Sequence, residues 1–377
     1  MSPTGIRTRA RQGFPRLTGR VFRARMLKVQ SAFREHGIEA LLVTRPSSLR
    51  YLSGFTGSNG LLVLRSRSVV LVTDGRYQVQ AREESMRAVR VVIVRGSLIE
   101  GAVRTGFLRK LSTIGFDDSA VTLRMYRDMK RVLSSASLKP VAGFIEDFAE
   151  VKEALELAAL KMAARISDSV IAQLLPLVRP GVQECDLASE ITYRQRRLGA
   201  ERDSFEPIVA SGPRTAMPHA RAGSRTLREG DAVLFDLGCV VSGYGSDITR
   251  TVFLGKPDPR LRKVYGIVRS AQDAALQAVH AGVSARAVDA AAREVIARAG
   301  YARNFPHSLG HGIGLEVHER PRLAPSSKDT LRAGHAITIE PGIYLPGAGG
   351  VRIEDDVYVH DRGCDLLTHS PRELIQL

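Results

Sequence analysis

Between residues 26 and 134, apolar residues alternate between helical spacing and the short continuous runs typical of buried strands. Residues 26–37 are amphipathic, as in a helix that covers a core. Strands are predicted at 38–44, 60–64, 69–73, 89–94 and 114–116, and helices at 76–85, 101–111 and 123–134. This order predicts a compact α/β domain. Because it contains no cluster of histidines and carboxylates, we expect it to have a structural or oligomerisation role.

The pattern changes near residue 150. A long helix is predicted over 151–178, and Pro180-Gly181 ends it. Beyond it the sequence repeats itself: residues 181–200 resemble 282–301, and 227–238 resemble 331–342. A period near 100 residues is too long for a solenoid unit. It predicts two copies of a helix-plus-hairpin half-domain, packed about a pseudo-twofold axis.

The repeat also places four acidic residues. Asp236 in the first copy aligns with Glu340 in the second, and each ends an apolar strand. A glycine-rich turn follows in both copies, and the return strand brings a second acid, Asp247 in the first and Glu354 in the second. Two hairpins that face each other across a pseudo-twofold axis would bring these four carboxylates together.

Carboxylates on apolar strands need a partner, unless they simply point to solvent, because a bare buried carboxylate is costly. The strands supply only Arg352 nearby, whereas two divalent cations would balance four charges. The segment 306–319 adds His307, His311 and His318. One nitrogen with several carboxylates suits Mn²⁺, Fe²⁺, Co²⁺ or Zn²⁺. Two such ions form a common hydrolytic centre that lowers the pKa of a bridging water.

Length and composition narrow the class of protein. The 377 residues exceed what one hydrophobic core usually serves, so we expect two domains or one duplicated domain. The sequence has no run of 18 apolar residues, which excludes a transmembrane helix. Three scattered cysteines are too few for a disulfide framework or a thiolate metal site. They favour a reducing compartment, and we expect a cytoplasmic protein.

The net charge of +16 is concentrated at the start of the chain. Residues 1–25 carry seven arginines and no acid, and without them the net charge falls to +9. This basic head lacks the apolar core of a secretory signal. A mistranslated leader with the true start at Met26, or a disordered tail, is favoured, with a transit segment or a basic arm left open. Salt-sensitive nucleic-acid binding is a further hypothesis, but no nucleic-acid motif supports it.

These residues together resemble a known family. The order of the five candidate ligands is similar to that of the pita-bread metallopeptidases, closest to the Xaa-Pro dipeptidase (prolidase) and aminopeptidase P branch. The motifs are Ser246-Asp247-Ile248-Thr249-Arg250-Thr251, Gly310-His311-Gly312-Ile313-Gly314, Glu340-Pro341-Gly342-Ile343-Tyr344 and Val351-Arg352-Ile353-Glu354-Asp355. The segments 51–55 and 73–77 resemble the creatinase-type N-terminal domain of that branch. The resemblance covers nearly all of residues 26–377 and implies this α/β domain over 26–148 and an α+β pita-bread catalytic domain over 149–377, preceded by the basic head over 1–25.

The resemblance also implies metal-binding roles. Asp236 would hold one metal ion, and His311 and Glu340 the other. Asp247 and Glu354 would bridge the pair. Glu340 additionally resembles the general base that acts on the bridging water. Creatinase has the same fold without these ligands, so the presence of all five favours an active enzyme.

Further roles implied by the resemblance concern the substrate. His219 resembles a catalytic histidine that lines the proline pocket, and His318 one that hydrogen-bonds the scissile carbonyl. His307 matches a pocket histidine, with a structural role equally open. Arg322 resembles the arginine that holds the free carboxylate of a dipeptide, unless it is a solvated surface charge. Arg352 competes for that role, although orienting the ligand carboxylates suits it better.

The resemblance therefore implies a dinuclear-metal peptidase that hydrolyses the Xaa-Pro bond of dipeptides or short peptides. Two Mn²⁺ ions are expected, with Co²⁺ or Zn²⁺ as alternatives. A homodimer is expected, with no membrane or nucleic-acid partner. An aminopeptidase P acting on longer Xaa-Pro-Yaa peptides and a non-catalytic binding protein of the same fold remain alternatives. Outside the motifs, His335 is expected at the surface and Cys239 as a small packed residue.

Overall fold

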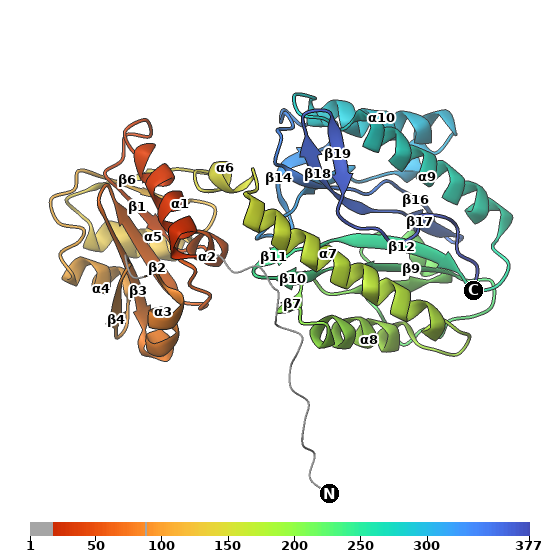
Figure 1. Cartoon of the computed structure of the whole chain (residues 1–377), viewed down its shortest axis with the longest axis horizontal. Helices are drawn as coiled ribbons and strands as arrows, with labels where there is room; N and C mark the ends of the chain where they lie inside the picture. The colour runs from red at the N-terminus through yellow and green to blue at the C-terminus, as the bar shows by residue number, and fades with distance from the viewer. Residues whose placement is uncertain (1–17, 87–88) are drawn as a thin grey trace, which may run out of the picture. The chain divides into compact units, whose positions relative to one another are not determined.

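The protein is described by a computed structural model that covers residues 18–86 and 89–377 (Figure 1). The chain forms two compact units, one that ends at Ala149 and one that runs from Glu150 to Leu377. Among the described helices, none combines the length and hydrophobicity needed to cross a membrane.

The N-terminal unit is built on a six-stranded sheet with the order β4-β3-β2-β1-β5-β6. β2 pairs antiparallel with β1 and β3, whereas the outer pairs on both sides are parallel. Apolar residues of the central strands pack against α4 and α5. The strands are Ala40–Val43 (β1), Gly60–Arg65 (β2), Ser68–Asp74 (β3), Arg90–Val94 (β4), Thr113–Phe116 (β5) and Ser137–Pro140 (β6). The helices are Gly19–Ser31 (α1), Pro46–Ser53 (α2), Gln78–Glu84 (α3), Leu98–Arg104 (α4), Leu123–Val132 (α5) and Glu146–Ala149 (α6).

Each of the five strands predicted in this unit is present within two residues of its predicted bounds. α4 begins three residues before its predicted start, because Ser97 caps it by accepting a hydrogen bond from the Glu100 amide. β6 and α2 were not predicted. β6 is a largely exposed edge strand without an apolar run, and α2 opens with a proline at its first residue.

α1 corrects the expected start of the folded chain at residue 26. The helix begins at Gly19, and Phe22 and Arg25 on it are buried. The Arg25 guanidinium donates to the Tyr51 carbonyl at 3.1 Å and lies over the Tyr51 ring. Residues 19–25 are therefore part of the domain rather than of a disordered head. The rest of the predicted basic head, residues 1–17, lies outside the described residues.

The C-terminal unit repeats one arrangement, as the duplication predicts. Its helices are Ala154–Leu174 (α7), Glu184–Arg197 (α8), Pro259–Ala278 (α9) and Ala285–Arg298 (α10). The strands of the first half are Arg202–Asp203 (β7), Ile208–Ser211 (β8), Ala232–Leu237 (β9), Cys239–Val241 (β10), Tyr244–Gly245 (β11) and Ile248–Phe253 (β12). Those of the second are Gly310–Gly312 (β13), Glu319–Leu323 (β14), Ala336–Ile339 (β15), Gly342–Leu345 (β16), Gly349–Arg352 (β17), Asp355–His360 (β18) and Gly363–Leu366 (β19).

Equivalent hydrogen bonds confirm the duplication. The Gly181 amide donates to the Leu227 carbonyl at 2.9 Å, and the equivalent Gly282 amide donates to the Leu331 carbonyl at 2.8 Å. Each half also pairs two long strands, β9 with β12 and β15 with β18. A shorter hairpin continues each pair, β10–β11 in the first half and β16–β17 in the second. The helix-plus-hairpin halves are therefore present as predicted.

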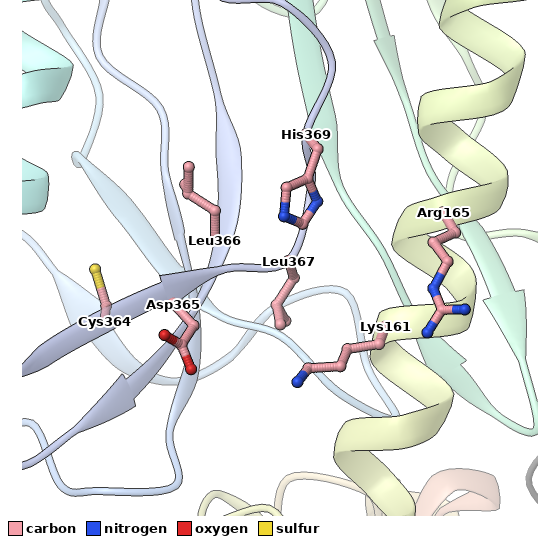
Figure 2. Close-up of a pocket in the computed structure, with 7 residues that line it drawn as sticks. All are labelled: Lys161, Arg165, Cys364, Asp365, Leu366, Leu367 and His369. Carbon is pink, nitrogen blue, oxygen red and sulfur yellow. The ribbon is translucent and has the colours of Figure 1, made fainter.

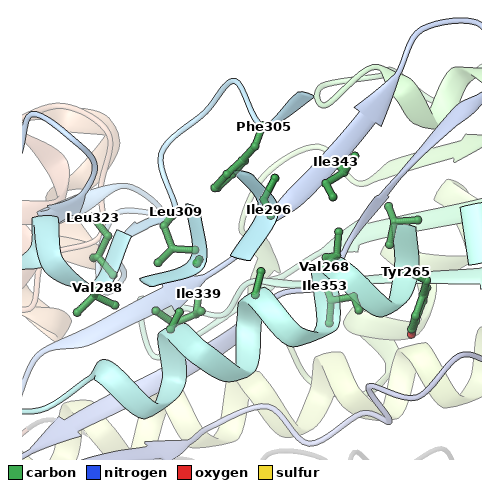
Figure 3. Packing of buried hydrophobic residues seen from close by; sticks show 14 of the residues in the cluster. Tyr265, Val268, Val288, Ile296, Phe305, Leu309, Leu323, Ile339, Ile343 and Ile353 are labelled. Atoms are coloured by element: carbon green, nitrogen blue, oxygen red, sulfur yellow. The ribbon is translucent and has the colours of Figure 1, made fainter. Parts of the chain in front are cut away.

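A hydrophobic core lies behind the strands of each half. In the second half, α9 and α10 pack on Ile339, Ile343 and Ile353 (Figure 3). In the first half, α7 and α8 share a core with Phe235 and Leu237. Because neighbouring side chains of a strand point to opposite faces, Asp236 is turned away from its helices. Burial of the apolar residues thus directs a carboxylate to the opposite face of the sheet.

His335 is a correction, because it is buried rather than at the surface. It closes the turn before β15, where its Nδ1 accepts from the Arg332 amide at 3.2 Å. Asp231, its counterpart before β9, likewise accepts from the Arg228 amide at 2.8 Å. The shared position in the repeat therefore carries a shared structural role. The expectation for Cys239 is confirmed, since it is fully buried.

Candidate metal centre

The four predicted acids occupy equivalent places in the two halves. Asp236 lies at the end of β9 and Asp247 immediately before β12. Glu340 follows β15, and Glu354 lies between β17 and β18. Each acid therefore sits where a long strand pair passes into its shorter hairpin. The fifth predicted ligand, His311, is the middle residue of β13, which pairs with β15.

The structure brings these five residues together. Asp247, His311 and Glu354 each offer a ligand atom, and the three atoms lie within 4.8 Å of one another. His311 Nε2 is 3.5 Å from Glu340 Oε1 and 3.9 Å from Asp247 Oδ2. Asp236 is close enough for its charge to raise the pKa of Asp247, Glu340 and Glu354.

The imidazole of His311 is prepared to bind a cation. Its Nδ1 lies 3.0 Å from the Gly312 carbonyl, which can only accept, so Nδ1 carries the proton. Nε2 then presents its lone pair to the acids. Burial and the neighbouring His318 lower the pKa of His311 to about 4. The ring is therefore neutral near pH 7, the form that coordinates metals.

The carboxylates repel one another when no cation balances their charge. Burial, with repulsion from Glu354, raises the pKa of Asp247 and of Glu340. Burial and Asp236 raise the pKa of Glu354 to about 8. Asp236 Oδ1 and Asp247 Oδ1 are buried and have no hydrogen-bond partner among the described residues. Orphaned buried oxygens with one neutral nitrogen are a donor set that fits divalent metal ions.

Neighbouring polar groups orient the ligands. The Thr249 hydroxyl donates to Glu354 Oε2 at 2.6 Å, and Thr338 donates to Glu340 Oε1 at 3.4 Å. Asp356 accepts a 2.8 Å hydrogen bond from the Asp247 amide. These contacts restrain the carboxylates of Glu354 and Glu340 and the backbone at Asp247. The sequence reasoning missed all three supports, although Asp356 stands in an acidic run directly after Glu354.

Each nitrogen of the Arg352 guanidinium donates a hydrogen bond to another group of the protein. Its Nη2 binds Asp236 Oδ2 at 2.5 Å, and its Nε donates to the Thr249 hydroxyl at 3.0 Å. Its Nη1 donates to the Tyr344 hydroxyl at 2.8 Å and to the Pro218 carbonyl at 3.2 Å. The side chain is buried. These contacts favour the orienting role over the substrate-binding role.

His307 continues this chain of contacts. Its Nδ1 lies 2.8 Å from the Ser308 carbonyl and must donate to it, which leaves Nε2 as an acceptor. Nε2 lies 2.9 Å from the Tyr344 hydroxyl. Because Arg352 donates to that hydroxyl, Tyr344 donates its own proton to His307. Burial lowers the pKa of His307 to about 4, so it stays neutral.

Three predicted residues lie at exposed positions around the acids. His318 presents its ring to His311, with ring centroids 4.4 Å apart. His219 is exposed and near enough for its charge to lower the pKa values of both His318 and His307. Arg322 is exposed and pairs with His311 across β13 and β14, so both side chains belong to the same face of that sheet.

A separate pocket lies between α7 and the segment that follows β18 (Figure 2). Its volume is about 560 Å³, and Lys161, Arg165 and Leu367 are among the residues that line it. Of the residues predicted to bind metal or substrate, none lines this pocket. It therefore adds nothing to the metal centre.

The fold and the convergence of acids with a neutral histidine define a metallopeptidase. Residues 158–361 match the model of metallopeptidase family M24, and residues 25–150 match the creatinase/prolidase N-terminal domain. The chain belongs to metallopeptidase family M24, and it is a metal-dependent peptidase with the two-domain organisation of the prolidases.

Particular relatives refine this class. The chain is 33% identical to a Xaa-Pro dipeptidase of Pyrococcus furiosus, over 93% of this chain and 99% of that protein. A solved Xaa-Pro dipeptidase from Bacillus anthracis has 38% identity and a TM-score of 0.91, over 94% of this chain and all of that one. A solved X-Pro aminopeptidase from Thermotoga maritima has 34% identity and a TM-score of 0.88, over 93% and 99%. Similar proteins thus include both dipeptidases and aminopeptidases.

Proposed function

We propose that this protein hydrolyses the Xaa-Pro bond of dipeptides, with two divalent metal ions held by the five convergent ligands. The observation that carries the proposal is the set of buried, mutually repelling carboxylates around the neutral Nε2 of His311. Bound divalent ions supply Lewis acidity and lower the pKa of water at the site. The names of the similar dipeptidases support the choice of the Xaa-Pro bond.

In this proposal Asp236 holds one ion, His311 and Glu340 hold the other, and Asp247 and Glu354 contact both. Glu340 would also accept a proton from the attacking water, which is supported by its carboxylate oxygen lying 3.5 Å from His311 Nε2 among the converging donors. Mn²⁺ is the proposed ion, with Co²⁺ or Zn²⁺ as substitutes. The oxygen-rich donor set supports this choice over softer metals.

The exposed residues around the acids are proposed to bind the peptide. His318, beside His311, would donate to the scissile carbonyl, and His219 would line the proline pocket with His307 behind it. The lowered pKa of His318 supports a neutral ring that can donate a hydrogen bond without adding charge, whereas His307 is held by the Ser308 carbonyl and the Tyr344 hydroxyl.

Arg322 is proposed to bind the free carboxylate of the dipeptide. Its pairing with His311 supports this role, because it puts an exposed guanidinium on the face that carries a metal ligand. A guanidinium binds a carboxylate through two parallel hydrogen bonds. An aminopeptidase acting on longer peptides would not need that contact, so Arg322 favours the dipeptidase reading.

The deciding experiment compares three substrates after reconstitution with Mn²⁺: an Xaa-Pro dipeptide, its C-terminal amide and an Xaa-Pro-Yaa tripeptide. We expect the dipeptide to be cut fastest and EDTA to abolish hydrolysis. Arg322→Ala should remove the preference mainly through KM, whereas Arg298→Ala, which removes an exposed arginine of α10, should not. Equal or faster cleavage of the tripeptide would establish the aminopeptidase alternative, and activity that survives complete metal removal would refute the metal centre.

The remaining parts of the proposal concern context. We infer a homodimer in the cytoplasm, with an N-terminal domain that ends near residue 148 and has no catalytic group of its own. Three free cysteines in the described residues support a reducing compartment. Light scattering and cell fractionation test these two points.

A further inference from the structure

We propose that Lys152, acting through Glu319, is a positioning residue for His318. The inference rests on the proposed role of His318 toward the scissile carbonyl. It concerns the residues just before α7, which contain no metal ligand and no residue that the sequence motifs single out. Lys152 and Glu319 are 167 positions apart in the sequence.

The ion pair between the two residues is well buried. The Lys152 side chain is 1% exposed, and its Nζ lies 2.5 Å from Glu319 Oε2, whose side chain is 13% exposed. The other carboxylate oxygen, Oε1, accepts a hydrogen bond from the Glu316 amide at 3.0 Å. Glu319 therefore ties Lys152 to the turn that immediately precedes His318.

Close packing leaves this turn little freedom. A Cβ atom at Gly314 would lie 2.5 Å from Glu319 Oε2 and 2.7 Å from Lys152 Nζ, so the ion pair packs against bare backbone. The Gly314 amide donates to the Glu316 carbonyl at 3.1 Å, and its carbonyl accepts from the Gly245 amide at 2.8 Å. The turn is thus bonded to the β11 strand, two residues before Asp247.

The strand geometry carries this constraint to His318. Glu319 opens β14 and pairs with Gly312 of β13, the neighbour of His311. His318 is the last residue of the bend before β14 and is joined directly to Glu319, so holding the Glu319 side chain restrains the backbone that carries His318. The His318 ring meets the His311 ring at 70°, with centroids 4.4 Å apart. A small rotation of the chain at residue 319 would move the His318 imidazole away from this position.

Lys152 itself is anchored. Its amide donates to the Gly334 carbonyl at 2.8 Å, and Val151 bridges to His335. A buried ion pair is a weak source of stability, since well-packed apolar residues often replace one without loss. This ion pair connects an anchored backbone to the turn that precedes His318. Its role is therefore better explained as holding His318 in position.

A double-mutant cycle tests the proposal with the full-length, Mn²⁺-loaded enzyme and an Xaa-Pro dipeptide. We expect Lys152→Met to lower kcat about 10–100-fold, the range for groups that orient active-site residues. KM and the metal content should stay near wild type, and Lys152→Arg should recover part of kcat. In the His318→Ala background, Lys152→Met should have little further effect on kcat, because the residue it positions is gone.

The control is Arg225→Met, which breaks the Arg225–Asp231 ion pair elsewhere in the same unit. It should lower thermal stability without changing kcat. If Lys152→Met does not fold, Glu319→Gln replaces it in the cycle with the same expectation. Additive losses in either cycle, or a loss of metal in step with kcat, would overturn the positioning role. If His318→Ala alone leaves kcat unchanged, the proposed function of His318 fails instead.

Discussion

The two halves of the C-terminal unit follow one plan but supply different acidic residues to the candidate metal centre. In the first half the acids are Asp236 and Asp247, and in the second they are Glu340 and Glu354. The second half also provides His311. A glutamate side chain is one methylene longer than that of an aspartate, so the two halves extend acids of unequal length into the candidate metal centre.

Each half supplies residues that hold the acids of the other half. Thr249 of the first half bonds Glu354 of the second, at 2.6 Å. In the other direction, Arg352 bonds Asp236, and Asp356 accepts from the Asp247 amide at 2.8 Å. Neither half holds its own acids in place unaided. Duplication thus provides the acids, and the contacts between the two halves bring them into one site.

The largest expected effect comes from the two acids proposed to contact both ions. Asp247→Ala and Glu354→Ala should each lose both metal ions and lower activity more than about 100-fold, beyond the range for supporting groups. Asp236→Ala should retain more metal, because that residue is proposed to hold one ion. Metal per protein chain, measured by elemental analysis, checks the ranking. Equal metal loss in all three variants would contradict the bridging assignment.

Arg352 tests the support that the second half gives to the first. Arg352→Met leaves Asp236 buried without the guanidinium that neutralises its charge. We expect metal affinity or activity to fall about 10–100-fold. Arg352→Lys should remain impaired. A lysine ammonium lacks the planar fork of donors with which the guanidinium contacts Asp236, Thr249 and Tyr344 at once. Metal titration of both variants provides the measurement. A lysine variant indistinguishable from wild type would show that only the charge matters.

The strands of the N-terminal unit, the duplication and the four converging acids were predictable, because they follow from hydrophobic periodicity and from the repeat. The choice of His311 among the nearby histidines rested on the family resemblance. The sequence did not predict the contacts that hold the ligands. Thr249 and Arg352 are 103 positions apart, and Thr338 resembles any other buried strand residue. His335 shows the same limit: its equivalence to Asp231 was visible, but its burial depended on a turn-closing hydrogen bond. Such side-chain partners depend on packing rather than on local pattern.

A smaller effect distinguishes support across the halves from support within one half. Thr249→Val keeps the shape but removes the 2.6 Å hydrogen bond to Glu354 and the acceptor for Arg352. We expect metal affinity to fall roughly tenfold. Thr338→Val, the matched control, removes a 3.4 Å contact to Glu340 within the second half and should cost less. A larger loss from Thr338→Val, in the same metal titration, would reverse the comparison.

The smallest effect is a dependence of stability on pH that metal should remove. In the metal-free protein the pKa of Glu354 is about 8, above its ordinary value of 4.5. Between these two values the folded state holds a proton that the unfolded state has released. The stability of the metal-free protein therefore falls as pH rises through this window. His311, with a pKa lowered to about 4, has the opposite effect, but its contribution is complete above about pH 6.5.

The interval from pH 6.5 to 8 thus reports on the buried carboxylates with raised pKa values, which are Glu354 together with Asp247 and Glu340. With EDTA present, we expect Tm to fall across this interval. With Mn²⁺ present, the fall should vanish or reverse, since metal binding displaces the proton and strengthens as pH rises. Glu354→Gln should lessen the decline in EDTA, because an amide does not titrate and its loss of charge also lowers the repulsion on Asp247 and Glu340. If the Tm of the metal-free wild type instead rose from pH 6.5 to 8, the carboxylates of the two halves would not repel one another. The conclusion that the two halves together form the site would then be wrong.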